Sequence, residues 1–110
     1  MAHPSKVKGD RAEREIARIL ADLTGQDVRR KLGAGRADDT GDLVGFPGVT
    51  IEIKNKASVT EGIRHGLDDL EREMTNSGDP LGVCFVRRPG GRWIAVMTPE
   101  MWATWWQEAQ

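Results

Sequence analysis

Residues 49–56 read VTIEIKNK, and this short stretch decides how the rest of the chain is interpreted. Its apolar and polar side chains alternate with the period of two that is typical of a β-strand. One face therefore carries β-branched apolar side chains, whereas the other carries Thr50, Glu52 and Lys54. A carboxylate and an ammonium two residues apart fit either a solvent-exposed face or a site that uses the pair chemically.

The composition indicates a globular protein. The chain has 110 residues, of which 38% are hydrophobic and 30% charged, so we expect one domain over residues 1–110. Residues 1–9 are expected to form a flexible arm. No stretch resembles a signal peptide or approaches the length of a membrane span, which predicts an intracellular, cytoplasmic location.

Charge is unevenly distributed along a chain whose net charge is only -1. Residues 1–36 carry nine Lys and Arg against five Asp and Glu, whereas residues 61–110 carry five against eight. This asymmetry is compatible with a basic surface beside an acidic site, although an ordinary mixed surface is the alternative. The single cysteine, Cys84, lies in an apolar run and is predicted to be a core residue.

Upstream of the strand, the pattern over residues 10–24 predicts a helix. Its apolar stripe has helical spacing and comprises Ile16, Ile19, Leu20 and Leu23. Asp10 is a candidate N-cap, with Glu13 three residues later as in a capping box. Gly25 fits the end of this helix.

Further elements give the order α-β-β-β-α-β-β-α. Short strands are expected within residues 26–32 and 42–45, and the second of these is expected to form a hairpin with the strand that begins at Val49. A helix over residues 61–76, strands over 81–88 and 92–98, and a last helix from Pro99 follow. This order predicts an α/β fold with a mixed central β-sheet flanked by helices.

The predicted hairpin would place Asp42 near Glu52, and strand geometry places Lys54 on the same side. Two carboxylates and a lysine would then converge on one point. Hard cations such as Mg²⁺ prefer oxygen ligands, and a lysine beside them can orient or activate water. This is the apparatus needed to hydrolyse a phosphodiester with Mg²⁺ or Mn²⁺.

Glu13 is a candidate third acidic group. Helical geometry places it roughly 60° from the centre of the apolar stripe, whereas Glu15 lies roughly 100° away on the other side. A carboxylate near the buried face needs a partner. Either the capping box or an acidic site that faces the strands accounts for its position.

Basic residues near the start of the chain are candidates for phosphate contacts, with a solvated helix face as the simpler alternative. The candidate DNA-binding residues are Arg11, Arg14, Arg29, Arg30, Lys31 and Arg36. His65 is interpreted as a partly exposed helical residue with a minor chance of a role in the site.

The order of these motifs resembles the PD-(D/E)XK nuclease superfamily, and within it the small Holliday junction resolvases of archaeal type. The segment KGDRAERE resembles the opening of that family, GDLVG its aspartate strand and IEIK its E-x-K strand, while Gly41 stands where the family has a proline. The resemblance covers nearly the whole chain. It implies a Mg²⁺-dependent endonuclease of four-way DNA junctions, in which Asp42, Glu52 and Glu13 form the metal site and Lys54 positions or activates water.

Two alternatives stay open: another endonuclease of that superfamily, of restriction or repair type, and a catalytically silent DNA-binding protein with the same fold. The resemblance also implies a homodimer, because a four-way junction needs two symmetric cuts. The last predicted helix carries an aromatic face of Trp102, Trp105 and Trp106, which fits either core packing or a dimer interface, and less readily base stacking.

Overall fold

The structure is a computed structural model that describes residues 4–31 and 38–110. Along the chain it contains α1 (Pro4–Thr24), β1 (Arg29–Arg30), β2 (Leu43–Val44), β3 (Val49–Lys54), α2 (Val59–Ser77), β4 (Leu81–Arg88), the 3₁₀ turn η1 (Pro89–Gly91), β5 (Arg92–Val96) and α3 (Pro99–Glu108). This succession confirms the predicted α/β class and element order. No helix within the described residues is long and apolar enough to cross a membrane.

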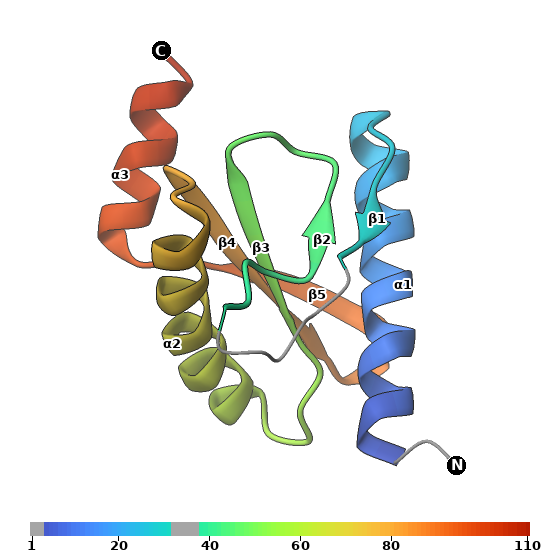
Figure 1. Ribbon diagram of the computed structural model, residues 1–110. Helices are drawn as coiled ribbons and strands as arrows, with labels where there is room; N and C mark the ends of the chain where they lie inside the picture. Colours follow the sequence, from blue (N-terminus) through green and yellow to red (C-terminus); the bar gives the residue numbers. More distant parts are fainter. Residues whose placement is uncertain (1–3, 32–37) are drawn as a thin grey trace.

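The three-stranded sheet has the order β3-β4-β5 (Figure 1). β3 and β4 are parallel, with Glu52 opposite Cys84, and α2 is the crossover that a parallel pair requires. β4 and β5 are antiparallel neighbours joined by η1. α1 lies on one side of the sheet, whereas α2 and α3 lie on the other.

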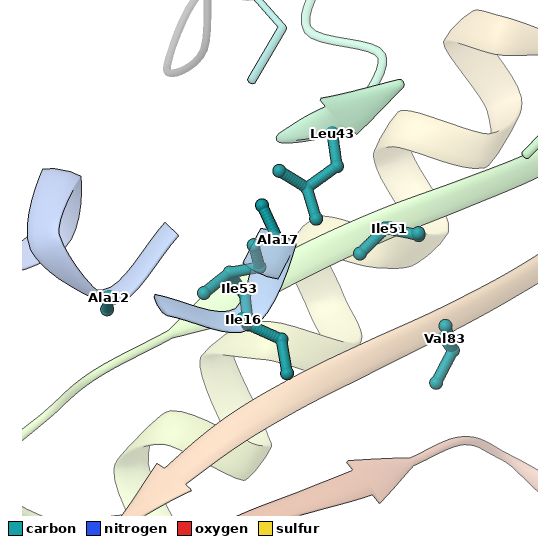
Figure 2. Close-up of a cluster of buried hydrophobic side chains, with 7 residues drawn as sticks. All are labelled: Ala12, Ile16, Ala17, Leu43, Ile51, Ile53 and Val83. Atoms are coloured by element: carbon teal, nitrogen blue, oxygen red, sulfur yellow. The ribbon is translucent and has the colours of Figure 1, made fainter. Parts of the chain in front are cut away.

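Each face of the sheet has its own hydrophobic cluster. Figure 2 shows the first, in which α1 packs on the sheet through Ile16 and its neighbours, and Leu43 of β2 joins them. The second cluster joins α2, β4 and α3 around Leu70 and Val86. Cys84 belongs to it and is completely buried, which confirms its predicted place in the core.

α1 begins earlier than the sequence pattern predicts. Pro4 is its first residue, so residues 4–9 are helical and the expected arm is at most residues 1–3, which lie outside the described residues. Proline suits the first helical turn because its missing N–H has no helical partner there. The capping box is therefore wrong, because Asp10 lies inside the helix. Leu23 is also not part of the buried stripe, since its side chain is 77% exposed.

The predicted hairpin between residues 42–45 and β3 does not form as a ladder. β2 pairs instead with β1, antiparallel, in a separate two-stranded sheet. A close approach to β3 survives, because the Asp42 N–H donates to the Ile51 carbonyl over 2.8 Å. Gly41 permits this approach. Proline cannot adopt its φ of 110°, and a Cβ at this position would crowd the Ile51 carbonyl oxygen at 3.0 Å.

Candidate active site

The polar face of β3 is buried, which excludes a solvent-exposed edge as its explanation. Thr50 and Glu52 are only 1% and 4% exposed, because α2 lies over this face of the sheet. Gly62 and Gly66 let the helix approach closely, and a Cβ at Gly66 would lie 3.2 Å from Cγ of Lys54 and against Cys84. Polar side chains in such a place need specific partners.

These partners come from α2 in regular order. The Thr50 hydroxyl lies 2.9 Å from that of Ser77, the last residue of α2, and donates to Asp79 over 2.8 Å. Glu52 is hydrogen-bonded to Glu73. The Lys54 ammonium donates to Asp69 over 2.6 Å. Two residues advance about 6.6 Å along a strand, and four residues advance about 6.0 Å along a helix. Successive polar residues on β3 and on α2 are therefore spaced nearly equally.

The side-chain contacts between β3 and α2 form a ladder, and Asp42 extends it from the other side of β3. Its carboxyl group is hydrogen-bonded to that of Glu52, which is in turn bonded to Glu73. The Ile53 N–H donates to Asp42 Oδ2 over 2.8 Å and to Glu52 Oε1 over 3.0 Å, so both carboxyl groups converge on one backbone donor. Hydrogen bonds between carboxyl groups require shared protons.

Burial and mutual repulsion make these three groups weak acids. Burial, and then the carboxyl group of Glu52, raise the pKa of Asp42 to about 9. Burial raises the pKa of Glu52 to about 8, with a further increase from Glu73. Burial also raises the pKa of Glu73 to about 7. The cluster therefore holds protons that ordinary carboxyl groups release near pH 4.

Lys54 lies beside the cluster as a fixed cation. Its ammonium is 4.0 Å from Glu52 Oε2 and much closer to Asp69. Burial acts to lower the pKa of Lys54, but the hydrogen bond to Asp69 and the nearby carboxylates outweigh it and raise the pKa. The side chain therefore carries a positive charge at neutral pH and is better suited to orienting an anion than to accepting a proton.

Glu13 faces the cluster from α1. Its side chain is 17% exposed, compared with 31% for Glu15, so the predicted order of burial is confirmed. Burial, and then the nearby carboxyl group of Asp42, raise the pKa of Glu13. Arg30 connects this carboxylate to Asp10, with contacts of 2.8 Å to Glu13 and 2.7 Å to Asp10.

These groups surround a cavity of ≈ 510 Å³, which brings Glu13, Asp42, Glu52 and Lys54 together as the sequence predicts. Arg30 and Lys31 line it as well. The Lys31 ammonium is occupied by Thr40, whose carbonyl lies at 3.1 Å and whose hydroxyl lies at 3.0 Å.

The other candidate DNA-binding residues lie elsewhere. Arg14 and Arg29 line no part of the cavity, and Arg29 pairs with Asp27. Arg11 faces a second cavity. Arg36 lies outside the described residues. His65 is exposed beside Glu61 and is not part of the cavity wall.

Sequence reasoning missed the two acidic residues that α2 supplies. Neither Asp69 nor Glu73 has a predicted role within the helix expected over residues 61–76. Yet they continue the line of Gly62 and Gly66 along one side of the apolar stripe of α2, and they are four residues apart. Two glycines followed by two acidic residues on one helix face indicate that the helix packs closely against a polar strand face. This pattern is the sequence signal that identifies Asp69 and Glu73.

The cluster has the donor chemistry of a divalent cation site, although it is not a preformed one. Within residues 4–31 and 38–110, no three Asp, Glu, His or Cys side chains are arranged as a ready set of metal ligands. The raised pKa values of Asp42 and Glu52 instead keep both carboxyl groups protonated at neutral pH, and a cation would displace those protons. Glu73 Oε1 is buried without a hydrogen-bond partner, and such an oxygen suits a hard cation.

The protonated cluster predicts a pH dependence of stability in the metal-free protein. Asp42, Glu52 and Glu73 keep protons in the folded state that the unfolded chain loses near pH 4. Folding therefore takes up protons, and the free energy of unfolding falls as pH rises from about 5 to about 9. We expect Tm in EDTA to fall by at least about 5 °C over that range. Thermal melts followed by circular dichroism check this, and a Tm that rises with pH would contradict the protonated cluster.

No protein-family model, curated protein or solved structure matched this chain in the comparisons made with each.

Proposed function

We propose that this protein is a metal-dependent endonuclease that hydrolyses DNA phosphodiesters, with branched DNA as its substrate. The observation that carries the proposal is the convergence of Glu13, Asp42, Glu52 and Glu73 on one cavity with the charged Lys54 beside them. Glu13, Asp42, Glu52 and Lys54 follow one another along the chain in the order that the resemblance to archaeal-type Holliday junction resolvases implies. Phosphodiester hydrolysis needs both elements, because negative charge accumulates at phosphorus.

Asp42 and Glu52 are the residues that would hold Mg²⁺ or Mn²⁺. Both accept from the Ile53 N–H, Asp42 from just before β2 and Glu52 from β3, and both would have to lose a proton to hold a cation. Glu73 and Glu13 border the same space and offer further oxygen atoms. When bound, such a cation supplies Lewis acidity towards the phosphate and makes water more acidic.

The remaining residues orient the substrate. Lys54, fixed by Asp69, presents a cation to a phosphate oxygen or to the attacking water. Arg30 lines the same cavity and holds Glu13 and Asp10 in place.

A titration of divalent metal with an end-labelled four-way junction tests this proposal. We expect cleavage to require Mg²⁺ or Mn²⁺, to fail in EDTA and to be weaker on the matching linear duplex. Efficient cutting of the duplex would favour an endonuclease of restriction or repair type. Tight binding without any cleavage would identify a catalytically silent DNA-binding protein.

The proposal includes a homodimer, because two symmetric cuts need two sites. α3 supplies the supporting observation: Trp102 and Trp106 are 58% and 56% exposed and stack with their ring centroids 6.0 Å apart. Trp105 instead donates to the Gly82 carbonyl over 3.0 Å, so it anchors α3 to β4. A symmetric interface would bury the exposed pair from both subunits.

We expect Trp102→Ser with Trp106→Ser to convert a dimer into a folded monomer, because neither indole belongs to the core. Sedimentation velocity at micromolar concentration measures the change, and circular dichroism checks the fold. Trp105→Ser is the matched comparison and should lower Tm, because it removes an anchored indole. A wild-type monomer without DNA would contradict the dimer.

A further inference from the structure

A second cavity of ≈ 650 Å³ lies on the opposite side of the N-terminal half of α1. One helix face, with Lys8 and Arg11, lines this basic groove, whereas Asp10 and Glu13 on another face line the carboxylate cavity. The chain also links the two spaces. Lys54 borders the carboxylate cavity, and residues 55–57, which follow it directly, border the basic groove. The first half of α1 is thus a ridge that separates the carboxylate cavity from the basic groove.

The charge of this basic groove is strongly one-sided. Its walls carry five cations, Lys8, Arg11, Lys56, Arg87 and Arg88, and a single carboxylate, Glu15. That carboxylate is already occupied, since it accepts from Arg87 over 3.2 Å and from the Trp93 indole over 2.9 Å.

Four of the five cations are available to a ligand. In the part of the chain that the structure describes, the side chains of Lys8, Arg11, Lys56 and Arg88 are exposed and form no ion pair. The start of α1 borders the same groove at Pro4 and has no acidic residue in its first turn, so the helix dipole adds positive potential.

We propose that this basic groove binds the phosphate backbone of DNA next to the scissile position, on the far side of the α1 ridge. The inference rests on the proposed nuclease function, because it names the part of the substrate that lies outside the carboxylate cavity. Unpaired cations along a groove suit a chain of regularly spaced phosphates. The cations of the carboxylate cavity lie among carboxyl groups, several of which they pair with, so a neighbouring surface of unpaired cations is better suited to supply affinity for such a backbone.

The salt dependence of binding tests the basic groove. Anisotropy of a labelled four-way junction in EDTA is measured between about 50 and 200 mM KCl, where each phosphate contact contributes about 0.9 to the slope of log K against log[salt]. Lys56→Ala with Arg88→Ala should weaken binding and reduce the magnitude of that slope by about 2. Both side chains are exposed and unpaired, so the fold should be unaffected.

Arg18→Ala with Arg64→Ala is the matched control, because it removes the same charge from exposed positions that border neither cavity. The control should keep the wild-type slope. An unchanged slope in the groove variant, equal losses in both variants or no DNA binding by the wild type would each overturn the inference. Binding to poly-glutamate is measured as well. If the groove variant lost that binding but kept its binding to DNA, the inference would also be overturned, and the groove would serve an acidic protein partner.

The outcome is separable from that of the proposed function. If no metal supports cleavage by the wild type, the nuclease proposal fails, whereas a reduced slope still assigns backbone binding to the basic groove. If the wild type cleaves and the groove variant keeps its slope, the nuclease proposal stands and the groove inference fails.

Discussion

Asp42→Asn is expected to lower the cleavage rate in Mg²⁺ by at least about 10²-fold, the effect of removing one oriented charge-stabilising group from an active site. The amide has the same shape, and its NH₂ group can donate to Glu52 while its oxygen accepts from the Ile53 N–H. The variant should therefore fold and bind DNA in EDTA as the wild type does. Only the negative charge that holds a cation is lost.

Single-turnover cleavage of a labelled junction measures the effect. Asp79→Asn is the matched control, because Asp79 meets the same face of β3 through Thr50 but lies outside the carboxylate cavity. Its cleavage rate should stay within about threefold of wild type, since no charge-stabilising group of the site is removed. An Asp42→Asn variant that cleaves at a near-normal rate would show that the metal site is assigned wrongly.

Lys54→Ala is expected to reduce the rate at saturating DNA by about 10²-fold while it weakens binding only slightly. The reason is that the ammonium is half-buried and fixed by Asp69, so it acts at one point rather than along the DNA surface. Asp69→Asn should lower the rate to a smaller extent, because Lys54 then stays charged but loses its anchor. Lys54→Arg should recover part of the activity.

Arg64→Ala is the control for this series, because it removes an exposed cation that borders neither cavity. Rate and affinity are measured separately, by single-turnover cleavage and by anisotropy. A Lys54→Ala variant whose affinity falls as much as its rate would show that Lys54 binds substrate without a role in the chemical step. Loss of Lys56 should affect the rate less than loss of Lys54.

Much of the fold follows from local pattern. The alternation in β3 placed Glu52 and Lys54 on one face correctly, and the apolar spacing of α2 and the turn before β5 fixed the later elements. Local pattern failed at the start of α1 and in the pairing of β2. Asp10 resembles an N-cap, yet proline at position 4 starts the helix earlier. The strand at residues 43–44 pairs with β1 rather than with β3, although Gly41 lets the backbone at Asp42 approach β3 closely.

The candidate site was only partly predictable for a similar reason. The shared face of Glu52 and Lys54 follows from the alternation of the strand, whereas Asp42 reaches Glu52 through the contact of its N–H with the Ile51 carbonyl rather than through the predicted hairpin. Asp69 and Glu73 join them only because α2 crosses over β3 in register. That register is set by helix packing at Gly66, which depends on Cys84 from yet another strand. No pattern within a single element contains this information.

The ladder between β3 and α2 has a consequence for how the protein unfolds locally. Glu52, Lys54, Asp69 and Glu73 all belong to one β3-α2-β4 unit, which is contiguous along the chain. Such a unit tends to unfold as a single cooperative block, and its amides are then among the slowest to exchange with deuterium. Glu13 lies on a separate helix that packs on the sheet from the other side. Fraying of α1 would therefore remove Glu13 and one wall of the basic groove while the carboxylate and lysine pairs of the central unit remain assembled.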